Sequence, residues 1–139
     1  MNNKLLRLTL VAVIILASAT AFFSCKKDKH TPPTMTFKTG GVYTSADATV
    51  GMNDTIIVGV TVTKEEDPLN TFNVSYAYDG ASSTTTDTTE TLTNNDQAVG
   101  FSRDVQIITR NVAGTETWTF TATDLDGNIA TKSIKLTVN

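Results

Sequence analysis

Two segments in the C-terminal third of the chain alternate between a polar residue, often threonine, and an apolar residue. The pattern is clearest in "ETWTFTATD" (116–124) and "ATKSIKLTV" (130–138). Successive side chains of a β-strand point to opposite faces, so this period of two predicts strands with one buried face. The Asp-Gly pair of "DLDGN" between them favours a tight hairpin turn.

Five further segments carry the same signal with varying clarity: "TMTFK" (34–38), "DTIIVGVTVTK" (54–64), "TFNVSYAY" (71–78), "TTTDTTETLT" (84–93) and "VGFSRDVQII" (99–108). The segment 84–93 is polar throughout, which is typical of an edge strand. Turn-forming Gly, Pro, Asn and Asp residues separate the segments. About seven short antiparallel strands in a single all-β domain predict an immunoglobulin-like β-sandwich over residues 34–139.

A different pattern precedes this domain. Lys4 and Arg7 form a short cationic start, residues 8–23 are almost entirely apolar, and small residues cluster just before Cys25. These three parts predict a secretory signal peptide over residues 1–24. The apolar run is shorter than the ~20 residues that a membrane-spanning helix needs.

The end of the apolar run, "FFSC", resembles the lipobox of bacterial lipoproteins. It is similar to the less strictly defined lipobox of Bacteroidota lipoproteins. The resemblance implies that Cys25 is diacylated and becomes the first residue of the mature protein. The alternatives are a secreted protein or an N-terminal membrane anchor in which the cysteine is incidental. Residues 25–33 carry charges and two prolines and are predicted to be a lipidated tether.

The lipoprotein resemblance implies attachment to the outer membrane through palmitate-type chains. In Bacteroidota lipoproteins, acidic residues just after the cysteine resemble a surface-export signal. Here Asp28 stands alone among lysines. The periplasmic face and the cell surface therefore both remain open.

The last hairpin, "GTETWTFTATDLDGNIATKSIKLTV", looks like the final hairpin of bacterial Ig-like domains, with Trp118 and Phe120 in its aromatic positions. The segment "MTFKTGGVYTSAD" is similar to the entry of such domains in Bacteroidota lipoproteins. Together the resemblance covers residues 34–139. It implies a fold and carries no activity.

Composition narrows the classes of function. The chain has 11 basic and 14 acidic residues; removing residues 1–24 leaves nine bases against 14 acids, a formal charge of -5. An acidic domain without basic clusters argues against nucleic acid as a partner. His30 and Cys25 are the only His and Cys in the chain, so no catalytic triad or His/Cys metal site is expected within residues 34–139.

Two groups of carboxylates are candidate calcium sites. The row Glu65, Glu66 and Asp67 reads more simply as a solvated loop. The turn that begins at Asp124 resembles the start of an EF-hand loop, but its sixth and twelfth residues are Ile and Lys instead of Gly and Glu. The sequence therefore predicts no metal site, no small-molecule cofactor and no catalytic residue.

Two residues outside the predicted core pattern are candidate sites. Tyr43 is a possible glycan contact, because aromatic rings stack on sugar faces; the other tyrosines and Trp118 share their phase with core residues. Thr88 lies in "DTT", which resembles the Asp-Ser/Thr motif to which Bacteroidota attach O-glycans. The alternative for Thr88 is an edge strand kept polar to prevent pairing with other chains.

These observations lead to one functional expectation and one alternative. The sequence predicts a non-enzymatic, lipid-anchored Ig-like module that binds or scaffolds an envelope protein, for example as an accessory subunit of an outer-membrane complex. The alternative is a surface glycan-binding lipoprotein.

Overall fold

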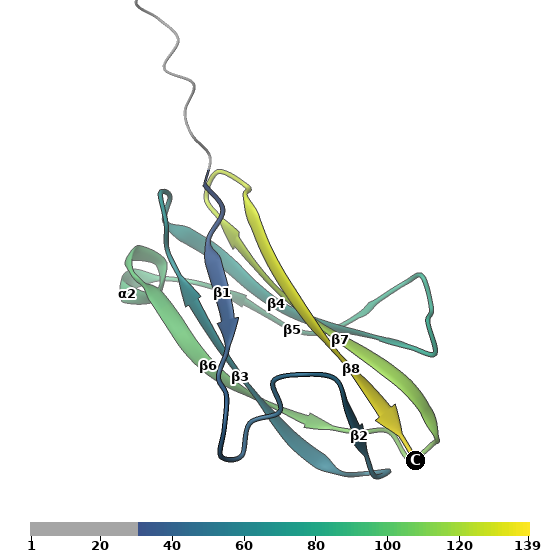
Figure 1. Cartoon of the computed structure of the whole chain (residues 1–139). Helices are drawn as coiled ribbons and strands as arrows, with labels where there is room; N and C mark the ends of the chain where they lie inside the picture. Colours follow the sequence, from purple (N-terminus) through teal and green to yellow (C-terminus); the bar gives the residue numbers. More distant parts are fainter. Residues whose placement is uncertain (1–30) are drawn as a thin grey trace, which may run out of the picture.

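The computed structural model describes residues 31–139, which form an immunoglobulin-like β-sandwich of two sheets (Figure 1). This confirms the all-β prediction. The predicted signal peptide, Cys25 and His30 lie outside the described residues. Within residues 31–139, no helix has the length and apolar character needed to cross a membrane.

One sheet has three strands in the order β1-β3-β6: β1 (Thr34–Phe37), β3 (Thr55–Thr63) and β6 (Gly100–Ile108). The other has five strands in the order β2-β8-β7-β4-β5: β2 (Ala48–Val50), β8 (Ile129–Val138), β7 (Gly114–Asp124), β4 (Leu69–Tyr78) and β5 (Thr85–Thr91). All seven predicted strands are present within one to two residues of their predicted bounds. The polar strand β5 lies at the edge of its sheet, as expected.

Two elements were not predicted. The three-residue strand β2 pairs with β8 in parallel, so residues 31–139 contain eight strands, and not all of them are antiparallel. A five-residue helix, α2 (Asn94–Ala98), lies between β5 and β6, where the sequence predicted only a turn. Both are too short to show a period of 2 or 3.6 residues, and this explains why the pattern missed them.

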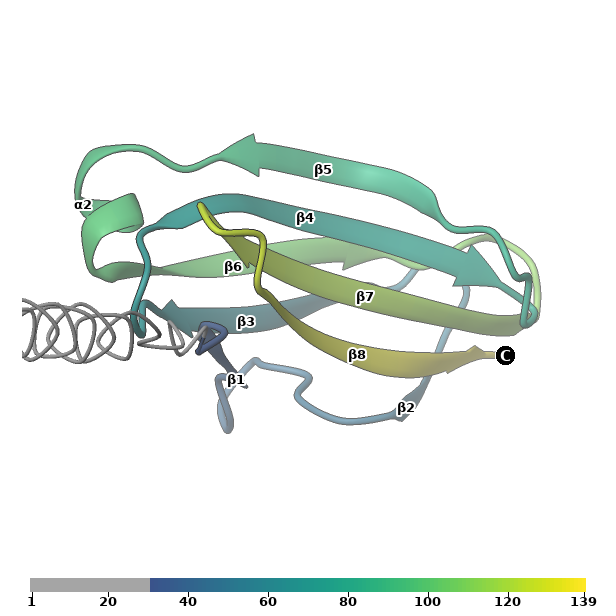
Figure 2. The same cartoon turned by 90° about the horizontal axis from the view of Figure 1, so that it is seen from above.

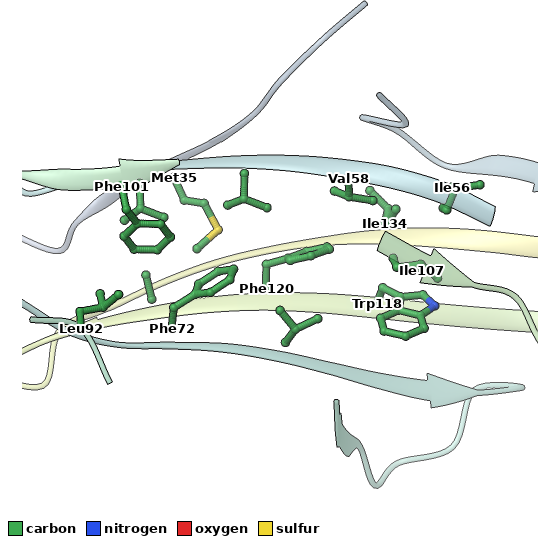
Figure 3. Packing of buried hydrophobic residues seen from close by; sticks show 14 of the residues in the cluster. Met35, Ile56, Val58, Phe72, Leu92, Phe101, Ile107, Trp118, Phe120 and Ile134 are labelled. Atoms are coloured by element: carbon green, nitrogen blue, oxygen red, sulfur yellow. The ribbon is translucent and has the colours of Figure 1, made fainter. Parts of the chain in front are cut away.

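The core lies between the sheets and is made by the apolar phase of each strand (Figure 3). Phe120 is fully buried at its centre. Two edge-to-face aromatic pairs cross from one sheet to the other: Phe37 with Phe120, at 5.4 Å between ring centroids, and Phe72 with Phe101, at 5.0 Å. Such pairs add about 0.5–1.5 kcal/mol to the free energy gained from burial alone.

The polar phase of the five-stranded sheet forms its outer face. On β7 this phase consists of the threonines between Thr115 and Thr123, all partly exposed. The register aligns them with short polar side chains of the neighbouring strands, for example Thr121 with Asn73 on β4 and with Thr131 on β8. The alternation in the sequence therefore separates a buried apolar face from a solvated hydroxyl-rich one.

Substituting Trp118 tests whether the apolar residues of β7 face the core and the threonines face solvent. Only 5% of its surface is exposed, and its indole Nε1 donates a hydrogen bond of 2.8 Å to Glu116. We expect Trp118→Ala to lower the free energy of unfolding by ~3–5 kcal/mol, because truncating a buried aromatic leaves a cavity. Urea denaturation measures the change. Thr119→Ala, on the outer face, serves as the control and should change stability by less than about 0.5 kcal/mol. Equal effects of the two substitutions would contradict the assignment.

Candidate functional site

The sandwich has an open side, at which the edge strands β5 and β6 of the two sheets face each other. Figure 2 shows both strands on the same side of the molecule. A cleft of about 250 Å³ lies there. Its lining comes from three strands: Phe72 and Val74 of β4, Asp87, Thr88 and Glu90 of β5, and Arg103, Asp104, Val105 and Gln106 of β6.

The floor of the cleft is apolar. Phe72 and Val74 belong to the buried face of β4, and Val105 is a partly buried residue of the inward phase of β6. Because β5 and β6 do not pair with each other, the cleft opens beside the core. Phe72 and Val74 are only 2% and 1% exposed, so Val105 provides most of the accessible part of the floor. The cleft is therefore a direct consequence of the sandwich being open at this edge.

A β-bulge shapes the wall on β5. Val74 of β4 pairs with Thr88, but the next residue, Ser75, pairs with Thr86. Asp87 is thus an extra residue without a partner on β4. In a regular strand, neighbouring side chains point to opposite faces; a bulge re-aims one of them. Asp87 and Thr88 consequently both line the cleft, and the Thr88 hydroxyl donates a 2.9 Å hydrogen bond to Asp87.

An ion pair closes one end of the cleft and joins the two sheets. Arg103 of β6 donates two hydrogen bonds to Glu90 of β5, at 3.1 Å from Nε and 2.6 Å from Nη2. Its Nη2 also lies 2.7 Å from Asp96 in α2. The hydrogen bonds to Glu90 and then to Asp96 raise the pKa of Arg103. We call Arg103, Glu90 and Asp96 the clasp.

The clasp could have been suspected from the sequence. Arg103 occupies the inward phase of β6, between Phe101 and Val105, where the alternation calls for an apolar residue. Its guanidinium also lies 5.0 Å from the ring of Phe101. A charge at an inward position of an edge strand needs a partner, so the position of Arg103 in the sequence already indicates an ion pair at this edge. The bulge at Asp87 leaves no comparable trace, because "TTDTT" fits a regular polar strand equally well.

Tyr43 lies close to the cleft but is engaged within the protein. Its hydroxyl donates a 3.1 Å hydrogen bond to Asp104, whose other oxygen accepts a 2.6 Å bond from Lys38. The Lys38 ammonium also lies 5.2 Å from the Tyr43 ring centroid. The bonds from Lys38 and Tyr43 lower the pKa of Asp104. The arrangement does not test glycan contact by Tyr43, which stays a prediction.

Thr88 is exposed on β5 and lies beside Asp87, as its motif requires. O-glycosylation of Thr88 likewise stays a prediction. The position of β5 at the edge of its sheet agrees with the alternative interpretation, a strand kept polar against pairing.

A second polar cluster lies near the end of the sandwich at which the chain terminates. Glu116 is fully buried, and its two oxygens accept bonds from the Trp118 indole and from the backbone N–H of Arg110, each at 2.8 Å. The Arg110 guanidinium binds Asp79 through both Nη atoms, at 2.8 and 2.6 Å. These contacts join β4, β7 and the β6–β7 loop, so the role of the cluster is structural.

The turn that begins at Asp124, whose sequence resembles the start of a calcium loop, is held by hydrogen bonds. Asp124 is buried; its Oδ1 accepts the Asn128 backbone N–H at 2.8 Å and its Oδ2 accepts the Asn128 side-chain amide at 2.9 Å. Over residues 31–139, no group of three or more His, Cys, Asp or Glu side chains is placed to hold a metal ion.

Comparison with known proteins gives structural neighbours only. No protein-family model matches the chain, and no curated protein matches it. A solved structure of superoxide reductase (neelaredoxin) from Ignicoccus hospitalis superposes with a TM-score of 0.51 at 9% identity, covering 76% of this chain and 80% of that one. A variant of the same protein gives 0.54 at 6% identity, covering 78% and 80%. At these identities the likeness shows the fold alone.

The comparison corrects the functional expectation. The sequence predicted a non-enzymatic scaffolding module, with a glycan-binding module as the alternative, because it indicated a single small domain, a lipid anchor and no recognisable reactive groups. That prediction is contradicted, since solved structures that share this architecture include a superoxide reductase, which is an enzyme. An Ig-like sandwich of this size is therefore no argument against catalysis.

Asp79 provides a test of the second cluster by acid titration. The Arg110 guanidinium and the Thr115 backbone N–H bind Asp79 and lower its pKa from 3.8 to about 2. A depressed pKa in the folded state stabilises the protein above the unfolded value, and this contribution is lost as the pH falls from about 4 to about 2. Asp79→Asn should therefore have a lower Tm than the original protein above pH 4, and the gap should narrow towards pH 2. A gap that is constant with pH would show that the carboxylate charge contributes nothing.

Proposed function

We propose that the chain binds a small molecule in the cleft between β5 and β6. The observation that carries this proposal is the bulge at Asp87, which directs two neighbouring polar side chains, Asp87 and Thr88, over an apolar floor. Binding sites for small molecules typically combine an apolar lining with a few placed polar groups. Bulges are also enriched beside functional sites, because they re-aim single side chains.

The size of the cleft limits the ligand. Sites for drug-sized molecules have volumes of about 300–1,000 Å³, whereas this cleft has about 250 Å³. The ligand is therefore a compact molecule, bound with part of its surface in solvent. The clasp fixes one end of the site, because the ion pair from Arg103 to Glu90 joins the two walls.

Superoxide reduction is not assigned to this cleft. One-electron reduction is carried out in proteins by a redox-active metal or an organic cofactor. The Ile-, Val- and Thr-rich range 31–139 contains neither His nor Cys, and its carboxylates do not gather into a group that could hold a metal. The side chains of the described domain thus do not fit a redox metal, although the fold is shared with superoxide reductases.

Filling the cleft tests the proposal. Titration of the ¹⁵N-labelled domain with a panel of compact polar molecules should shift amide signals of β5 and β6 in NMR spectra. Val105→Trp places a large ring over the floor and should weaken this binding at least about tenfold, or ~1.4 kcal/mol. Thr88→Trp fills the same cleft from the other wall and covers the case in which Val105→Trp does not fold.

The matched control is Val112→Trp, in the β6–β7 loop, where the valine side chain is already 63% exposed. It should leave binding unchanged. Undiminished shifts in both cleft-filling variants, or shifts confined to other surfaces, would contradict a ligand site between β5 and β6.

The location of the chain is a separate proposal, supported by the sequence. The cationic start, the apolar run and the "FFSC" box together favour a bacterial outer-membrane lipoprotein acylated at Cys25, and residues 25–33 then link the lipid to the domain. Each acyl methylene buried in the bilayer contributes ~0.8 kcal/mol, so two or three chains anchor the protein firmly. The cleft would then be presented at a membrane surface.

Cys25→Ser should abolish acylation, because serine provides no thiol to receive the lipid. The expected result is loss of labelling by a palmitate analogue, with accumulation of unprocessed precursor or of protein released from the membrane fraction. Cys25 is the only cysteine of the chain, so any label that survives the substitution would have another attachment point. Surviving label would refute lipidation at Cys25.

A further inference from the structure

We infer that the ligand of the cleft is an organic cation, an ammonium or guanidinium attached to a small apolar group. This inference rests on the proposed function, since it names the class of molecule that the same cleft accepts. It follows from the charges that line the cleft, from the bonds in which those charges are already engaged, and from the apolar floor beneath them.

The lining carries an excess of negative charge. Three carboxylates line the cleft, those of Asp87, Glu90 and Asp104, against one base, Arg103. Counting the ion-pair partners that lie outside the lining adds one acid, Asp96, and one base, Lys38. The balance is two negative charges in either count. A site bounded by low-dielectric walls concentrates such a field, which attracts cations and repels anions.

Four of the five N–H groups of Arg103, the one base in the lining, already donate hydrogen bonds. The Nε and Nη2 groups of Arg103 donate to Glu90, Nη2 also donates to Asp96, and Nη1 donates to the Ser102 carbonyl at 3.2 Å. Two carboxylates therefore neutralise this guanidinium. A carboxylate or phosphate ligand would meet a single uncommitted N–H on a guanidinium whose charge is already neutralised, which makes anion binding unfavourable.

Asp87 differs from the other carboxylates of the lining. Glu90 is paired with Arg103, and Asp104 is paired with Lys38. Among the described contacts, Asp87 has a hydrogen bond from the Thr88 hydroxyl and no ion pair with a basic side chain. That hydroxyl contacts Oδ2, so Oδ1 is left to accept a bond from a ligand. A charge-assisted bond of this kind is about twice as strong as a neutral one.

The floor specifies the rest of the ligand. Val105, which is partly exposed, offers hydrocarbon surface beside the bulge that carries Asp87, and the almost fully buried Phe72 and Val74 lie behind it. A bare metal ion would gain nothing from this surface, and Asp87 alone is too few ligands for one. An amine with a compact apolar group uses both features, because its cationic end meets Asp87 while its apolar end covers the floor.

Three probes of one size and different charge test the inference: benzylamine, which is a cation at pH 7, benzyl alcohol, which is neutral, and benzoate, an anion. NMR titration of the ¹⁵N-labelled domain at millimolar probe follows the amides of β5 and β6. We expect benzylamine to bind about three- to tenfold more tightly than benzyl alcohol, the range for a partly exposed charged pair. Benzoate should bind most weakly, and the preference for benzylamine should decline with added salt.

Asp87→Asn removes the unpaired charge and keeps the shape of the side chain. It should weaken benzylamine binding about three- to tenfold and leave benzyl alcohol unchanged. The matched control is Glu66→Gln, in the β3–β4 connection, which changes the net charge equally outside the cleft. It should leave both affinities as they are.

The outcomes separate this inference from the proposal on which it rests. Equal binding of benzylamine and benzyl alcohol in the cleft, or no effect of Asp87→Asn, would overturn the preference for a cation and leave a small-molecule site standing. Tighter binding of benzoate would overturn it in the same way. If no probe of any charge shifts the amides of β5 and β6, the small-molecule site itself is refuted, and the inference with it.

Discussion

The sandwich depends on apolar contact between the inner faces of its two sheets, because residues 31–139 contain no cysteine that could join them covalently. Phe120 lies at the centre of this contact, and the pairs Phe37–Phe120 and Phe72–Phe101 cross between the sheets. Antiparallel edge strands leave unpaired backbone groups and exposed core wherever two sheets end together. The open side between β5 and β6 is such a place, and its properties follow from the side chains that these two edge strands present there.

The clasp protects this open edge with charged side chains. Inward-pointing charged residues and bulges are two means by which natural edge strands avoid pairing with other chains; Arg103 and Glu90 provide the first, and Asp87 the second. Because Arg103 and Glu90 bond across the gap, they close the sandwich at one end without covering the floor beside them. Protection of the edge and formation of the cleft thus have the same structural cause.

The sequence predicts the strands well because burial on one face imposes a period of two on most of them; the polar edge strand β5 is the exception among the longer ones. It fails where elements are short, as in β2 and α2, and where the phase is interrupted. Val99, expected inward, is exposed because the chain joins β6 only at Gly100. The cleft could be predicted only in part: Arg103 breaks the apolar phase of β6 visibly, but the bulge at Asp87 depends on the pairing of β5 with β4, which composition and periodicity do not encode.

The incorrect functional expectation had a related origin. It took a single small domain without recognisable reactive groups as evidence against an enzyme, yet the same architecture occurs in superoxide reductases at 6–9% identity. At such distances a fold sets where a site can be, and the side chains set what it does. Here the fold leaves one side of the sandwich open, and the residues placed there, Asp87 and Thr88 over an apolar floor, supply one carboxylate and one hydroxyl, too few ligands to hold a metal ion. The proposal of a small-molecule site follows from these side chains, whereas the shared fold by itself assigns this chain neither a reaction nor a ligand.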